Sequence, residues 1–203
     1  MIFDDPAACA QAALAEVAKT NRRRILLSGS LGPQWLKTLT EILHPHGLEL
    51  NDPDPDPLGF EDLISQVMPS MACVIFQNPG YFGTLRDLTG LTLECREWDV
   101  PLLHLTPPTR PDLAEATKRL AHALHRLPGI RVITDDYINR FSLYLGEDVD
   151  AVDVMERLQD HGIQGCEAAG LDYPHYPELH PVLIINTPQD HDRLVQALRA
   201  ALA

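Results

Sequence analysis

The chain has 203 residues, of which 45% are apolar, and its formal net charge is −13. This acidic balance argues against nucleic acid and anionic membranes as partners, because both bind through clustered Lys and Arg. No apolar run is long enough to span a membrane, and the first residues, MIFDDPAAC, lack the basic start of a signal peptide. We therefore expect a cytoplasmic protein.

The first elements alternate between helix and strand. The Ala-rich segment 6–20 predicts a helix, the apolar run 25–28 a buried strand, and the leucines of 36–43 a second helix. A short strand is expected over 48–50. The alternating prolines of residues 51–59, NDPDPDPLG, cannot continue a helix and predict an exposed turn.

The same alternation continues to the end of the first half. The expected elements are, in chain order, a short helix over 63–67, the most apolar strand at 72–77, a loop at 78–83, a helix over 85–95 and a strand over 100–105. Alternating helices and strands favour a parallel sheet with right-handed crossovers. Thr106-Pro107-Pro108-Thr109 then divides the chain, and we predict one domain over 1–108 and another over 109–203.

The second domain is expected to be an αββαβα module. Its elements are a helix over 112–127, strands over 130–134 and 141–145, a helix over 150–161, a long loop over 166–181, a strand over 182–185 and a final helix that begins at Thr187 and Pro188. Phe141, Leu143 and Leu145 alternate with Ser142 and Tyr144. This alternation predicts an antiparallel strand with one face in water.

A candidate ligand site follows the strand at 72–77. Gln77, Asn78, Tyr81 and Phe82 lie in a loop at the carboxyl end of a parallel-type strand, where open α/β sheets bind ligands. Ser28 and Ser30 follow the strand at 25–28 and are expected at the same edge. The alternative is that these are ordinary turn residues and that Phe82 packs in the core.

Other residues of possible chemical interest carry weaker patterns. Arg22-Arg23-Arg24 is either a solvated strand edge or a phosphate contact. The four cysteines form no CxxC pair and the nine histidines form no HExxH motif, so we expect neither a disulfide nor a metal site. His104 is interpreted as a histidine with its hydrogen bonds satisfied in the core.

Three segments carry a resemblance to a known family. These are RRRILLSGSLGPQWLKTL (22–39), CVIFQNPGYFGTLRDL (73–88), and the C-terminal pair PGIRVITDDYINRFSLYL with GIQGCEAAGLDYPHYPELHPVLIINT. In this order they resemble the glycine dehydrogenase (decarboxylating) P-protein family, subunit 1-like, of the glycine cleavage system. The resemblance implies a shortened pyridoxal-phosphate transferase fold of type I, an α/β domain with a parallel sheet followed by an α+β C-terminal sandwich.

The resemblance also implies a cofactor site, and the sequence departs from it. Such enzymes need a Schiff-base lysine, an aspartate at the pyridine nitrogen and a phosphate cup at a helix N-terminus. The family carries the first two between the second and third segments, an interval that here is only 89–127 and contains one lysine, Lys118. At the expected phosphate cup stands Asp4-Asp5-Pro6-Ala7, which repels a phosphate. We expect pyridoxal-phosphate binding to be lost.

Two hypotheses of function follow. The first is a non-catalytic binding, assembly or regulatory protein, acting as a homodimer or with a larger partner such as a P-protein paralogue or a lipoyl carrier protein. Trp98, with Tyr81 and Phe82, is the expected interface. The alternative is an accessory subunit or small enzyme of glycine cleavage or other lipoyl-carrier-linked metabolism that uses the loop 77–83.

Overall fold

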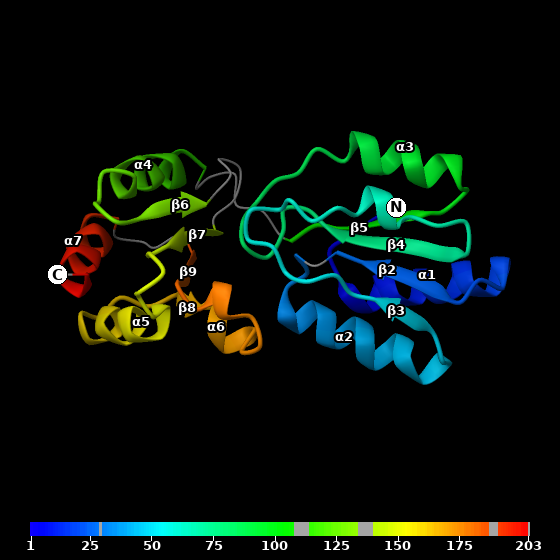
Figure 1. The fold of residues 1–203 in the computed structure, drawn as a ribbon, viewed down its shortest axis with the longest axis horizontal. Coiled ribbons are helices and arrows are strands. Elements are labelled where there is room, and N and C mark those ends of the chain that lie inside the picture. The colour runs from blue at the N-terminus through cyan, green and yellow to red at the C-terminus, as the bar shows by residue number, and fades with distance from the viewer. Residues whose placement is uncertain (29, 108–113, 134–139, 187–190, 203) are drawn as a thin grey trace. The chain divides into compact units, whose positions relative to one another are not determined.

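A computed structural model describes residues 1–28, 30–107, 114–133, 140–186 and 191–202, which form two compact units (Figure 1). Unit 1 comprises Met1–Tyr81 and Leu85–Pro108, and unit 2 comprises Phe82–Thr84 and Thr109–Ala203. The short segment Phe82–Thr84 therefore belongs to unit 2, although the residues on either side of it belong to unit 1.

Unit 1 is built on a five-stranded parallel sheet, as the alternation of elements predicted. Its strands, in spatial order, are β1 (Ile2–Phe3), β5 (Leu102–Leu105), β4 (Met71–Gln77), β2 (Arg24–Leu27) and β3 (Glu49–Asn51). All seven residues of β4 are buried, because this strand lies in the middle of the sheet and both its faces are covered. β1 was not predicted, since two residues carry no periodicity.

Helices cover both faces of this sheet (Figure 1). α1 (Pro6–Thr20) and α2 (Pro33–Leu43) pack on the face that carries Ile25, Leu27 and Ile75. α3 (Thr89–Glu97) and the 3-10 turn η2 (Ile64–Gln66) cover the face that carries Val74 and Phe76. Alternate residues of β4 thus supply two separate cores.

Two loops of unit 1 differ from expectation. The predicted helix 85–95 begins only at Thr89, because the side chain of Asn78 bonds both backbone polar groups of Arg86 and the Asp87 carboxylate accepts the Thr89 N–H. The proline-rich turn is not helical, as predicted, but it is not wholly exposed. Its Pro55 and Gly59 are buried. η1 (His44–His46) extends the end of α2.

Unit 2 is built on a four-stranded antiparallel sheet. The strand order is β6 (Arg131–Ile133), β7 (Arg140–Tyr144), β9 (Val182–Asn186) and β8 (Cys166–Ala168). The helices are α4 (Ala114–Leu124), α5 (Ala151–Asp160), the short α6 (Ala169–Asp172) and α7 (His191–Ala201). The antiparallel pairing expected for residues 141–145 is confirmed.

Two expectations for unit 2 were wrong. The segment 166–181 is not a loop, because it contains β8, α6 and the 3-10 turn η4 (Pro177–Leu179), so the order αββαβα omitted a strand. Ser142 does not face water. It is fully buried and its hydroxyl donates to the Phe82 carbonyl at 2.8 Å. The predicted helix start at Thr187 and Pro188 lies outside the described residues.

Candidate functional site

The carboxyl edge of the unit 1 sheet gathers polar side chains that are buried. Ser28, Ser30, Gln77 and Asn78, all singled out from the sequence, have 0%, 4%, 5% and 7% of their surface exposed. The backbone holds the first of them in place, since the Ser28 N–H donates to the Ile75 carbonyl at 2.9 Å. These residues do lie at one sheet edge, because β2 and β4 are neighbouring parallel strands.

The two serines meet at the carboxylate of Glu61. The Ser28 hydroxyl donates to Glu61 Oε1 at 2.9 Å and the Ser30 hydroxyl donates to Oε2 at 3.2 Å. Burial raises the pKa of the Glu61 carboxyl, whereas the Ser28 hydrogen bond and the Arg86 charge favour its ionised form and oppose that rise. No sequence pattern pointed to Glu61, because this residue lies in a loop and matches no motif.

Arg86 completes the cluster. Its Nη1 lies 2.8 Å from Glu61 Oε1 and its Nη2 donates to the Glu61 carbonyl at 2.8 Å. The Glu61 side chain is 4% exposed and that of Arg86 22%. The guanidinium also lies 5.6 Å from the centroid of the Phe76 ring, a cation–π contact. Glu61, Arg86, Ser28 and Ser30 are hereafter called the edge cluster.

The amides of Gln77 and Asn78 are engaged with backbone groups. Gln77 Oε1 accepts the Gly32 N–H at 2.7 Å and its Nε2 donates to the Pro79 carbonyl. Asn78 Oδ1 accepts the Arg86 N–H at 2.9 Å and its Nδ2 donates to the Arg86 carbonyl at 3.0 Å. Both side chains therefore shape the loops around the edge cluster.

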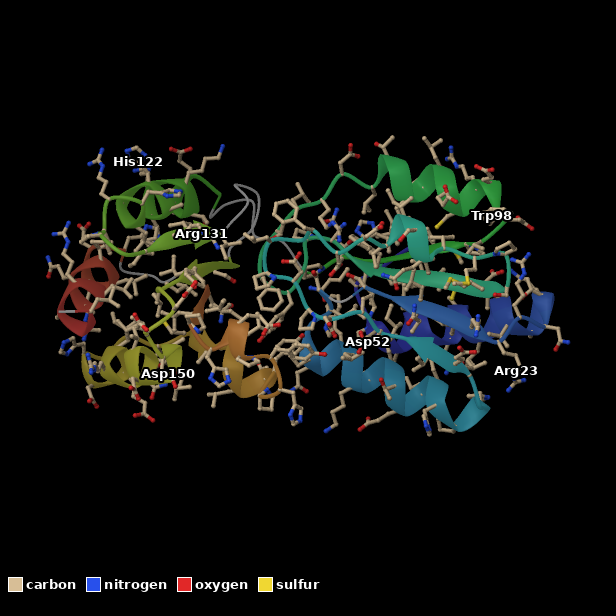
Figure 2. The ribbon with its side chains drawn as sticks, in the orientation of Figure 1. Arg23, Asp52, Trp98, His122, Arg131 and Asp150 are labelled. Carbon is tan, nitrogen blue, oxygen red and sulfur yellow. The ribbon has the colours of Figure 1, made fainter. Side chains whose placement is uncertain are left out.

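An acidic residue lies beside the edge cluster at the end of β3. Asp52, labelled in Figure 2, is an exposed residue, yet the surrounding protein partly desolvates its carboxyl group. This desolvation, with the charges of Glu61 and Asp54, raises the pKa of Asp52 to about 6. Like charges that share one site disfavour ionisation in this way.

The three aromatic residues expected at an interface differ in how far they are buried. Tyr81 and Phe82 are only 7% and 1% exposed, and the Phe82 ring lies 6.0 Å from that of Tyr173. Both side chains are buried, and Phe82 packs in the core as the alternative interpretation expected. Trp98, which follows α3, is 39% exposed and its indole N–H donates to Glu94 (Figure 2).

The remaining sequence candidates have structural contacts. Arg22 donates to the carbonyls of Met71 and Asp99, and Arg24 pairs with Glu49 at 2.7 Å. His104 Nε2 lies 2.9 Å from the Asn78 carbonyl. Among the residues that the structure describes, no three His, Cys, Asp or Glu side chains are grouped to hold a metal ion. No helix in that part of the chain is long and apolar enough to cross a bilayer.

Pyridoxal phosphate requires a lysine inside its site and free amides at a helix N-terminus. The chain's lysines are Lys19, Lys37 and Lys118, and all three are exposed on helices. Lys19 pairs with Glu16 at 2.6 Å. At the N-terminus of α1, where the resemblance places a phosphate cup, the Asp5 carboxylate accepts the N–H groups of Ala7 and Ala8. A carboxylate thus occupies the amides that a phosphate would use.

Part of the chain is similar in sequence to curated proteins. It is 44% identical over 94 residues to the probable glycine dehydrogenase (decarboxylating) subunit 1 of Rhodospirillum rubrum, an alignment that covers 46% of this chain and 21% of the relative. The predicted resemblance is confirmed. The protein of the same description from Rhodospirillum centenum is 34% identical over 94 residues, with the same two coverages. The chain spans about a fifth of the length of these relatives, and no protein-family model matches it.

Solved structures show the same fold. One is the P-protein glycine decarboxylase of the glycine cleavage system, in inhibitor-bound form, with a TM-score of 0.76 at 15% sequence identity. The superposition covers 98% of this chain and 70% of the decarboxylase chain. A putative aminotransferase from Burkholderia pseudomallei matches 96% of this chain and 80% of its own with a TM-score of 0.66, also at 15% identity. The predicted fold class, that of the type I pyridoxal-phosphate-dependent transferases, is confirmed.

Proposed function

We propose that this chain is a non-catalytic, P-protein-like subunit that serves glycine cleavage by binding another protein. The sequence similarity to glycine dehydrogenase subunit 1 supports a role in glycine cleavage. The observation that carries the non-catalytic part is the placement of Lys19, Lys37 and Lys118, because a Schiff-base lysine must reach a cofactor inside a site and all three are exposed on helices.

Exposed apolar side chains on unit 1 support the binding role. Ile64 and Met68, in and after η2, are 46% and 43% exposed, and Leu93 on α3 is 60% exposed. η2 and α3 are neighbours, since a Cβ added at Gly90 would lie 2.9 Å from Ile64 Cδ1. These three residues and Trp98 are hereafter called the α3 surface, and exposed apolar side chains of this kind mark interaction sites. The partner is a second copy or a larger protein, such as a P-protein paralogue or a lipoyl carrier protein.

Cofactor binding is tested by incubating the purified chain with pyridoxal phosphate and recording its absorption spectrum. No aldimine band and no adduct after borohydride reduction are expected, whereas a known pyridoxal-phosphate enzyme treated in parallel gives both. A reducible adduct in the native protein that disappears in Lys118→Ala would overturn the non-catalytic proposal.

Association is tested by light scattering coupled to size exclusion, on the chain alone and mixed with purified P-protein or lipoyl carrier protein. Leu93→Asp is expected to abolish the complex. Leu171→Asp is the matched control, because Leu171 is also 60% exposed but lies in unit 2. A wild-type chain that is monomeric and binds neither protein contradicts the binding role.

The second candidate is an accessory subunit or small enzyme that contributes a ligand-binding edge. The edge cluster favours it, because buried ionic and hydroxyl groups lie at the sheet edge where α/β proteins bind ligands. This alternative gains support if the chain is monomeric and the Leu93→Asp variant behaves like the wild type.

A further inference from the structure

Three donors in unit 1 converge on one carboxylate. The hydroxyls of Ser28 and Ser30 and the guanidinium of Arg86 all bond the side chain of Glu61. We propose that Ser28, Ser30 and Arg86 form a binding site for a small carboxylate ligand, and that the Glu61 side chain fills this site in the observed conformation. The inference goes beyond the proposed function, since it depends neither on a partner nor on pyridoxal phosphate.

Each of the three donors has contacts besides those to the Glu61 carboxylate, although Arg86 also donates to the Glu61 carbonyl. Ser28 is fixed by its backbone bond to Ile75 on β4, and the Ser30 N–H donates to the Ser28 hydroxyl oxygen at 3.2 Å. Arg86 is held through its backbone by the Asn78 amide, and its guanidinium lies over the Phe76 ring. Donors that are already oriented bind an anion without a large ordering cost.

Glu61, by contrast, belongs to a segment with little regular structure. Residues 52–63 contain no helix or strand. Ser30 contacts this segment at the Asp56 carbonyl, at 3.4 Å, and the Asp56 side chain bonds two amides of the segment itself, those of Leu58 and Phe60. Glu61 therefore reaches the site from a segment without regular structure, whereas Ser28 is bonded directly to strand β4, and we take Glu61 as the member of the edge cluster best able to leave.

Electrostatic repulsion also favours exchange. The charge of Glu61 is among the causes that raise the pKa of Asp52, so the closed arrangement keeps two mutually repelling carboxylates close together. A free carboxylate that takes over the Ser28, Ser30 and Arg86 donors would let the segment carrying Glu61 and Asp52 move into water. A planar, two-oxygen acceptor is favoured over a phosphate, because the site now holds a carboxylate with a hydroxyl on each oxygen.

The test removes the internal occupant and supplies an external one. The melting temperature of Glu61→Ala is measured in sodium formate, sodium acetate, sodium phosphate, sodium chloride and acetamide at equal concentrations. Formate or acetate is expected to raise the melting temperature by about 3 °C or more above its value in chloride. Acetamide, which is uncharged, is expected to leave the melting temperature unchanged. The wild type, with its site filled, is expected to respond much less.

Matched double variants locate the effect. Glu61→Ala with Ser28→Ala is expected to lose most of the formate response, whereas Glu61→Ala with Thr38→Ala keeps it, because the Thr38 hydroxyl bonds only within α2. If Glu61→Ala does not fold in chloride, its refolding yield from urea is compared in formate and in formamide, and a higher yield in formate is expected. Equal melting temperatures in formate and in chloride overturn the proposal, and so do equal refolding yields in formate and in formamide. Stabilisation by phosphate alone also overturns it.

Discussion

Glu61 Oε1 lies 2.8 Å from Arg86 Nη1, although the two residues are 25 positions apart and neither lies in a helix or strand. The pair is largely buried and joins the loop after β3 to the loop after β4. Burying two charges has a large desolvation cost, which their attraction offsets only while both partners are present. The pair therefore makes both loops sensitive to single substitutions.

Removing the arginine should expose this sensitivity. Arg86→Met leaves the Glu61 carboxylate buried without its cation, and we expect the free energy of unfolding in urea to fall by about 3 kcal/mol. Arg96→Met, which removes an exposed charge from α3, should change it by no more than about 0.5 kcal/mol. Adding Glu61→Gln to Arg86→Met should restore part of the loss, and strictly additive losses would contradict the pairing.

Asp52 should make stability depend on pH in an unusual direction. Its pKa in the folded protein, about 6, exceeds the usual 3.8, so the native state holds this proton more tightly than the unfolded chain does. The resulting penalty is complete above about pH 6 and disappears as the pH falls toward about 4. Asp52→Asn should therefore melt at a higher temperature than wild type near pH 7.5, and this difference should shrink as the pH falls below about 6 and vanish only below the usual pKa of 3.8.

Asp87 provides the control of opposite sign. Hydrogen bonds from Thr89 lower the pKa of the Asp87 carboxyl, so its contribution is present at neutral pH and is lost as the solution becomes acidic. Asp87→Asn should lower the melting temperature near neutrality. If both variants changed the melting temperature in the same direction at neutral pH, the opposite pKa shifts assigned to Asp52 and Asp87 would be contradicted.

The cysteines should be unreactive in the folded protein. All four are buried, and desolvation raises the pKa of the Cys9 thiol to about 12 and those of Cys95 and Cys166 to about 11. Thiolate is the reactive form, so Ellman's reagent should label the native protein very slowly and all four cysteines in urea. Ser65→Cys, at an exposed position, should add one rapidly labelled thiol.

The buried serine of β7 should contribute to the stability of unit 2. Ser142→Ala removes the hydroxyl that donates to the Phe82 carbonyl, and we expect the free energy of unfolding to fall by about 1 kcal/mol. Thr38→Ala, which removes an exposed hydroxyl, should change it by no more than about 0.5 kcal/mol. Equal effects of the two substitutions would show that the Ser142 hydrogen bond adds nothing.

Local patterns predicted most elements of unit 1 because each pattern reflects burial within a few residues. The continuous apolar run of β4 predicted a strand covered on both sides. At the start of α1, the Asp5 side chain caps the helix and Pro6 takes a position in its first turn, both of which suit a helix start. The same approach failed for β8, whose three residues form a strand only because they pair with β9.

By itself, the sequence determined the parallel sheet of unit 1, the antiparallel course of β7 and the resemblance that similarity to glycine dehydrogenase subunit 1 confirms. Only the tertiary structure decided that Glu61 meets Arg86 and that Tyr81 and Phe82 are buried instead of available to a partner. The reason is physical. Periodicity and capping act over a few neighbouring residues, whereas a buried ion pair between loops depends on where the sheet brings distant parts of the chain together.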